Sequence, residues 1–236
     1  MSRINKLIFL VTLFAIAMAF MESSVVIYLR ELYYKSGFNF PLKIIPAFIG
    51  KVEFYRELCT VIMLIIIGIL AGKTHLQRFS FFILAFAVWD IFYYVFLYVC
   101  LSWPQSLNTW DILFLIPVPW VGPVWTPCAL SLLMVIGSLF VIYKTERNST
   151  FQIPLQYWWM LISGSFICIV AFMWDYLAFT FHKEKNWSIL SNQDLFSEIE
   201  NYVPKEFNYG LFMIGFILMV SSVGISILKT IKIKKK

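Results

Sequence analysis

The chain has 236 residues, of which 61% are hydrophobic, 19% aromatic and only 14% charged. A soluble domain carries about 45–50% apolar and about 25% charged residues, so a soluble protein of this length would be unable to bury so much apolar surface. The composition therefore predicts an all-α polytopic integral membrane protein, with lipid as its solvent. The net charge of +6 follows from the basic loops described below and does not indicate a nucleic-acid partner.

Six segments are apolar and long enough to cross a bilayer, at about 20 residues per crossing. The first of them also resembles a signal peptide, with Ala17-Met18-Ala19 as its cleavage site. The apolar run nevertheless continues past that site to Leu29, which favours an uncleaved helix. We predict one transmembrane domain, 1–236, with helices at 7–29, 52–71, 79–101, 127–143, 157–181 and 209–228.

Two connecting segments are unusual. Residues 30–51 combine Tyr and Phe with glycine and proline, as expected for a segment at the membrane interface. Residues 182–208 form a long loop with most of the soluble-like sequence. The loops on the same predicted side of the membrane as the two chain termini are basic and contain almost no acidic residues. The positive-inside rule therefore predicts that both termini are cytoplasmic and that 182–208 is external.

The third unusual segment, 104–126, is rich in proline. It is long enough to enter the membrane and too broken to cross it, and lipid does not tolerate exposed irregular backbone. We therefore expect a re-entrant or interfacial segment, buried in protein or lining a wet cavity. Thr126 followed by Pro127 predicts a helix start there, with Thr126 as the N-cap.

Three of the four aspartates directly follow a tryptophan: Trp89-Asp90, Trp110-Asp111 and Trp174-Asp175. Random placement of nine tryptophans and four aspartates would give well under one such pair. Two of these aspartates lie inside long apolar runs, where an ionisable group is costly and commonly functional.

The predicted topology puts the ionisable residues of the spans in their middle or outer halves. This indicates a polar cavity that is open to the outside, in which carboxylates outnumber arginines. Surplus buried carboxylates must stay protonated or take up a cation or proton. The alternative is that these groups only hold the helices together, with Arg56 and Arg30 neutralising two carboxylates. The candidate site residues are Glu22, Arg56, Glu57, Asp90, Tyr94, Asp111 and Asp175.

Several familiar site motifs are absent from the sequence: GxSxG, the P-loop, HExxH, CxxC and GxGxxG. The four cysteines lie in or beside apolar segments, and the two histidines, His75 and His182, lie in predicted loops. We therefore expect no metal and no cofactor.

The stretch WDIFYYVFLYVCLSWPQSLNTWDILFLIPVPWVGP resembles a group of small bacterial inner-membrane proteins, and this resemblance extends over the whole chain. It implies a location in the bacterial inner (plasma) membrane and implies no particular activity. WDYLAF, Asn186-Trp187-Ser188 and Pro204-Lys205-Glu206-Phe207 are locally similar to the membrane-embedded lycopene cyclases. That family has paired acids after the proline, whereas Glu206 stands alone here, so no role is transferred.

Three functions stay open on these grounds. The protein either binds or moves a small solute, cation or proton, or acts as an enzyme on a lipid or isoprenoid with Asp90 as acid or base. The third possibility is a structural or assembly subunit of an oligomer or larger inner-membrane complex. An inverted repeat would favour transport, but only the Trp-Asp pairs recur. A lipid-sized lateral opening would favour the enzyme. For all three functions, we expect the protein to be embedded in the lipid bilayer.

Overall fold

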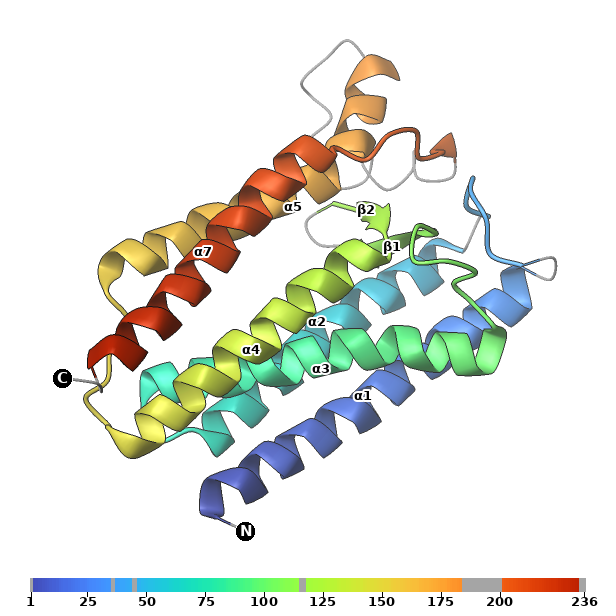
Figure 1. Cartoon of the computed structure of the whole chain (residues 1–236). Helices are drawn as coiled ribbons and strands as arrows, with labels where there is room; N and C mark the ends of the chain where they lie inside the picture. Colours follow the sequence, from blue (N-terminus) through green and yellow to red (C-terminus); the bar gives the residue numbers. More distant parts are fainter. Residues whose placement is uncertain (1, 35–36, 44–45, 115–117, 184–200, 234–236) are drawn as a thin grey trace.

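The computed structural model describes residues 2–34, 37–43, 46–114, 118–183 and 201–233. Within these ranges the protein is a bundle of six long helices with one two-stranded hairpin (Figure 1). All six helices are long and apolar enough to cross a membrane, which confirms the predicted multi-pass helical fold. The helices are α1 Arg3–Tyr33, α2 Ala47–Ala71, α3 His75–Leu101, α4 Trp125–Arg147, α5 Leu155–Lys183 and α7 Tyr209–Ile233.

Most of the helices extend beyond their apolar runs, so the predicted bounds were too short. At the start of α1, the Ser2 hydroxyl accepts a hydrogen bond from the backbone N–H of Asn5, at 3.4 Å. At the start of α3, Thr74 accepts in the same way from Gln77, at 3.2 Å. Such caps satisfy first-turn N–H groups that have no partner within the helix, so polar residues lengthen the helix past its hydrophobic segment.

The bundle has two parts. In the larger part, α3 packs against α1, α2 and α4, and in the smaller part α5 packs against α7. Both chain ends lie at one end of the bundle, which we call the termini end, where α1 begins and α7 ends (Figure 1). We call the opposite end, which carries the hairpin, the hairpin end.

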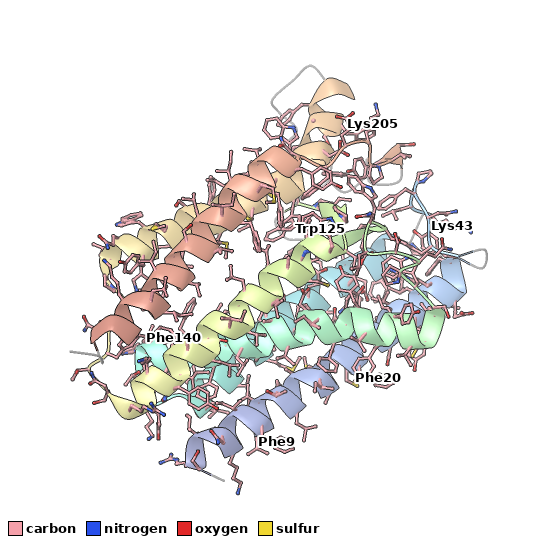
Figure 2. All side chains as sticks on the ribbon, viewed as in Figure 1. Phe9, Phe20, Lys43, Trp125, Phe140 and Lys205 are labelled. Atoms are coloured by element: carbon pink, nitrogen blue, oxygen red, sulfur yellow. The ribbon has the colours of Figure 1, made fainter. Side chains whose placement is uncertain are left out.

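Trp125 connects the two parts near the hairpin end. It lies at the start of α4, where its ring stacks on Tyr209 at 6.2 Å and meets Phe212 edge-on at 5.4 Å (Figure 2). Both partners belong to α7. The contact therefore fixes the hairpin end of α7 against α4.

Glycines allow two close helix contacts. A Cβ on Gly72 would lie 2.4 Å from the backbone nitrogen of Arg78, so the turn between α2 and α3 leaves no room for a side chain. A Cβ on Gly164 of α5 would lie 2.7 Å from the carbonyl oxygen of Gly215 of α7. One glycine from each helix thus brings the two backbones together, as small residues do in membrane bundles.

The proline-rich segment 104–126 contains an antiparallel hairpin that the sequence analysis did not predict. Strand β1, Trp110–Phe114, pairs with β2, Trp120–Pro123, and Asp111 lies opposite Gly122. The segment returns to the end from which it started, as expected for a re-entrant or interfacial element (Figure 1). Strand pairing supplies the backbone hydrogen bonds that proline denies to a helix.

The predicted start of the fourth helix was wrong by two residues. Helix α4 begins at Trp125, after Val124, and Thr126 is not its N-cap. The Thr126 hydroxyl instead donates a hydrogen bond to the carbonyl oxygen of Pro123, at 2.7 Å. This bond ties the first turn of α4 to the last residue of β2.

The outer surface of the helices is apolar. On α1, Phe9 and Phe20 are 57% and 48% exposed (Figure 2). Large exposed apolar side chains also cover α2, α5 and α7. In water such a surface would drive aggregation, whereas in a bilayer it contacts lipid tails.

Candidate functional site: a polar network in the hairpin half

Arg56 joins α2 to α1 through two carboxylates. Its guanidinium donates to Glu22 of α1 and to Glu53 of its own helix, with Nη2 2.6 Å from Glu53 Oε2. The Thr60 hydroxyl donates to the second oxygen of Glu22 at 3.2 Å. Glu22 is only 8% exposed, so its charge depends on these donors. The charge of Glu57 also acts on Arg56.

Arg30 at the end of α1 pairs with Asp111 of β1. Arg30 Nη2 lies 3.4 Å from Asp111 Oδ1, and both residues are buried. The guanidinium carbon also lies 3.7 Å from the ring centre of Trp103 and 4.3 Å from that of Phe38. Two aromatic faces and one carboxylate therefore surround this cation.

The pair between Arg30 and Asp111 is incompletely satisfied. Arg30 Nη1 and Asp111 Oδ2 are buried and have no hydrogen-bond partner among the described residues. Burial raises the pKa of Asp111 to about 6, although Arg30 opposes this shift. The carboxylate thus retains hydrogen-bonding capacity in a place that disfavours its charged form.

Asp90 of α3 accepts a hydrogen bond from the Ser131 hydroxyl of α4, at 2.8 Å. Ser131 is 1% exposed, whereas Asp90 is only partly buried. The two arginines make their ion pairs with other carboxylates, so neither neutralises Asp90 directly. Among the described contacts, the partner of Asp90 is a hydroxyl and not a cation.

Two tyrosines lie between these groups. The charges of Arg30, Arg56, Asp90 and Asp111 all act on Tyr93, which places it among the three sets of contacts. The ring of Tyr94 lies 5.0 Å from that of Tyr93 and 6.5 Å from that of Trp103. The Tyr94 hydroxyl neighbours the Asp111 carboxyl. We call this group the polar network: Glu22, Arg30, Glu53, Arg56, Glu57, Thr60, Asp90, Tyr93, Tyr94, Asp111 and Ser131.

Six of the seven candidate residues thus lie in one network, and Asp175 does not. Asp175 of α5 faces the segment that precedes α7, where its Oδ2 accepts from the Tyr202 hydroxyl at 2.6 Å and from the Lys205 N–H at 3.1 Å. The Glu206 N–H donates to Oδ1 at 3.4 Å. Burial, and the nearby Asp175 charge, raise the pKa of the Tyr202 hydroxyl. This arrangement fastens the segment to the helix.

The repeated Trp-Asp pairs do not share one environment. Asp90 meets a serine, Asp111 an arginine and Asp175 a loop backbone. Their tryptophans differ as well, since Trp89 is 8% exposed and Trp174 is 51% exposed. The repeat therefore does not mark three copies of one site.

Several members of the network were not among the candidates. The three-residue spacing of Glu53 and Arg56 predicts that they pair, and Arg30 is a charged residue at the end of the first long apolar segment. Neither Glu53 nor Arg30 is among the candidate site residues predicted from the sequence. Ser131 and Thr60 carry no charge within apolar helices, so hydropathy gives no signal for them.

The described part of the chain contains no preformed metal site. No group of three or more His, Cys, Asp or Glu side chains there is arranged to hold a metal ion. The four cysteines are free thiols, and Cys128 lies near the charge of Asp90. Any cation taken up by the network would therefore be held by few protein ligands.

No family model matches the chain, and neither a curated protein nor a solved structure matches it. The function proposed below rests on the residues of this chain.

Proposed function

We propose that the protein binds, and moves across the membrane, a small solute that is a cation or a proton, using the polar network as its site. The observation that carries this proposal is the imbalance of charge within the network. Four carboxylates, Glu22, Glu53, Asp90 and Asp111, accompany only two arginines, Arg30 and Arg56. A site at this depth cannot hold surplus negative charge, so it takes up protons or a cation.

Asp90 is the residue that we expect to exchange the proton or bind the cation. Arg56 and Arg30 already compensate Glu22 and Asp111, whereas Asp90 has the neutral hydroxyl of Ser131 as its partner. When Asp90 is ionised, its carboxylate oxygens and the Ser131 oxygen together provide hard ligands for a small cation. When it is protonated, the carboxyl is neutral and suits its apolar helix.

Orientation is part of the same proposal. The termini end is rich in Lys and Arg and the hairpin end holds the acidic network, so the positive-inside rule puts the hairpin end outside a bacterial inner membrane. Reporter fusions after Lys73, Ser149 and Lys236 are then all cytoplasmic. A reporter that is active outside the cell when fused after Ser149 would refute this orientation.

The test of function uses purified protein in proteoliposomes, with a dye for internal pH and imposed gradients of Na⁺ or K⁺. Asp90→Asn keeps the shape of a protonated carboxyl, so we expect normal folding and loss of flux. Ser131→Ala is expected to weaken flux without abolishing it. Asp175→Asn is the matched control, because it makes the same change outside the network.

Two results would contradict the proposal. One is flux through Asp90→Asn at the level of the unmodified protein. The other is an Asp90→Ala variant that unfolds and is restored by adding Ser131→Ala, because that pattern indicates a contact that only holds α3 to α4. A thermal-unfolding series in detergent on the same variants distinguishes lost flux from lost folding.

A further inference from the structure

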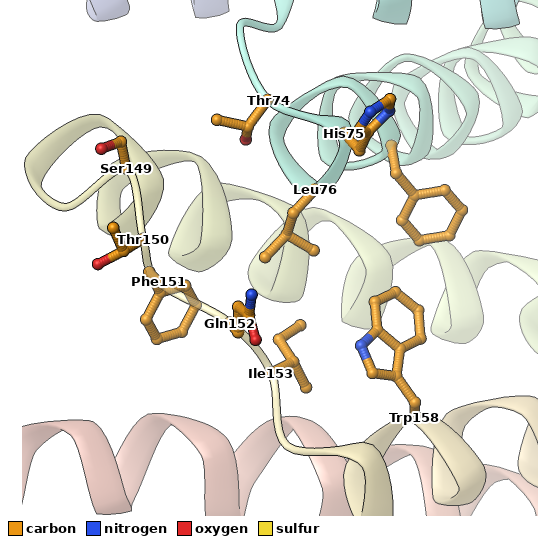
Figure 3. A pocket seen from close by; sticks show the side chains of 10 residues that line it. Thr74, His75, Leu76, Ser149, Thr150, Phe151, Gln152, Ile153 and Trp158 are labelled. Carbon is orange, nitrogen blue, oxygen red and sulfur yellow. The ribbon is translucent and has the colours of Figure 1, made fainter.

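A pocket of about 480 Å³ lies at the termini end, away from the polar network (Figure 3). It is formed where the start of α3, the turn after α4 and the start of α5 approach one another. It therefore lies where the larger and smaller parts of the bundle meet. The lining residues are Thr74, His75, Leu76, Phe79, Ser149, Thr150, Phe151, Gln152, Ile153 and Trp158.

Several hydrogen-bond donors line the pocket. His75, the Ser149 hydroxyl and the Gln152 amide all contribute to it. His75 and Leu76 belong to the first turn of α3, where backbone N–H groups have no partner within the helix. None of the ten described lining residues is acidic. This set of donors fits an anion such as a phosphate group.

Apolar side chains also line the pocket. The rings of Phe79 of α3 and Trp158 of α5 are in contact there, with their centres 5.7 Å apart. Leu76 and Ile153 add aliphatic surface. Both rings lie further into their helices than the polar residues, so polarity falls from the end of the bundle toward its middle. A phospholipid has the same gradient, from headgroup to acyl chain.

Charge around the pocket favours an anionic lipid. Four basic residues lie at this end of the bundle: Lys73 in the turn before α3, Arg78 in the first turn of α3, and Lys144 and Arg147 in the last turn of α4. Glu146 is an acidic residue at the same end, and its Oε2 lies 3.2 Å from Lys73 Nζ. Lysine and arginine side chains at headgroup depth attract anionic lipid headgroups.

We propose that this pocket binds the headgroup of an anionic phospholipid, with the phosphate held by the hydrogen-bond donors and an acyl chain along Phe79 and Trp158. Helices α3 and α5 pack mainly against other elements, so a lipid in this place adds contacts between the two parts of the bundle. The bound lipid therefore acts as a structural ligand, and this role is independent of the transport proposed for the other end.

The test titrates short-chain phosphatidylglycerol into the full-length protein in a non-ionic detergent and follows the thermal-unfolding midpoint. Phosphatidylcholine of the same chain length, glycerol phosphate and inorganic phosphate are titrated in parallel. We expect phosphatidylglycerol to raise the midpoint at lower concentration than any of the other three. Equal responses to the two lipids, or saturation by inorganic phosphate alone at the same concentration, would overturn the proposal.

Gln152→Glu locates the site, because it puts a carboxylate beside the bound phosphate. We expect about a tenfold loss of affinity for phosphatidylglycerol from like-charge repulsion near the protein surface. Gln105→Glu is the matched control, an exposed glutamine at the hairpin end. His75→Ala removes one donor and is expected to weaken binding less. Unchanged binding by Gln152→Glu, or an equal loss with Gln105→Glu, would overturn the assignment to this pocket.

Discussion

Arg30 and Asp111 are 81 positions apart in the sequence, yet they form a buried ion pair that fastens the β hairpin to the end of α1. Only one oxygen of Asp111 and one terminal nitrogen of Arg30 take part in it. Trp103 supplies a ring face to the same guanidinium at 3.7 Å. The pair connects the hairpin, the polar network and the segment that follows α3.

Breaking this pair is expected to be more costly than removing it. Arg30→Gln leaves the buried Asp111 carboxylate without its cation and should lower the free energy of unfolding by about 3–5 kcal/mol. Asp111→Asn removes the carboxylate charge, which burial already disfavours, and should cost far less. The double variant should lose clearly less than the sum of the two. Unfolding in mixed detergent micelles measures all three variants, and additive losses would show that the two residues are not coupled.

Arg30→Lys tests the contribution of the aromatic contacts of the same arginine. Lysine keeps the positive charge but lacks the planar group that stacks on Trp103 and Phe38. We expect a loss smaller than that of Arg30→Gln. A lysine variant as stable as the unmodified protein would mean that the aromatic contacts contribute little.

Acid pH should stabilise the fold through Asp111. Its pKa in the folded state is raised from 3.8 to about 6, mainly by burial, so the folded state binds more protons than the unfolded chain between these values. Stability due to this group is therefore greatest below about pH 4, falls as the pH rises through about 6, and is constant above that.

The measurement is the difference in unfolding midpoint between the unmodified protein and Asp111→Asn across this range. Asparagine does not titrate, so the difference isolates Asp111 from other groups. As the pH rises, we expect the unfolding midpoint of the unmodified protein to fall by a few degrees relative to that of Asp111→Asn. Movement in the opposite direction would mean that the Arg30 charge outweighs burial.

The helices were predictable because hydropathy depends only on the local sequence, and all six appear where long apolar runs occur. The hairpin was not, because β1 and β2 are five and four residues long and are separated by prolines rather than by a typical two-residue turn. The prolines correctly excluded a crossing helix. They gave no indication that Asp111 would face Gly122 across a ladder.

The sequence predicted which half of the bundle holds most of the candidate residues, but only partly which of them meet. Depth follows from position along a span, so Glu22, Arg56 and Asp90 were correctly placed in one half of the bundle. Which groups meet depends on how each helix is rotated and which helices are neighbours. Asp175 has a comparable depth, but α5 packs on α7 rather than on α3, and it therefore joins a different set of contacts.

A further prediction about stability concerns the contact between α5 and α7. Gly215→Ala would put a Cβ 2.6 Å from the carbonyl oxygen of Gly164, and the backbone there has no free space to move into. We expect a loss of about 1–3 kcal/mol in the free energy of unfolding. Gly224→Ala is the matched control on the same helix, since a Cβ there has nothing within 4 Å.

The control should be neutral or gain up to about 1 kcal/mol, because alanine favours a helix over glycine. Both variants are compared by unfolding in mixed micelles. Equal effects of the two substitutions would show that α5 and α7 are not in close contact at Gly164.

The last prediction separates Asp175 from the polar network. Asp175→Ala removes the acceptor for the Tyr202 hydroxyl and for the N–H groups of Lys205 and Glu206, so the segment before α7 should loosen from α5. Trypsin should then cleave after Lys205 faster than in the unmodified protein. Tyr202→Phe removes one of the three hydrogen bonds and should accelerate cleavage less.

Flux through proteoliposomes should be unchanged in Asp175→Ala, because Asp90, Ser131 and both arginines keep their partners. Asp90→Asn should show the reverse pattern, with lost flux and normal cleavage at Lys205. The two readouts together assign each aspartate to one role. Lost flux in Asp175→Ala with unchanged cleavage would place Asp175 in the transport site and contradict the division between anchor and network.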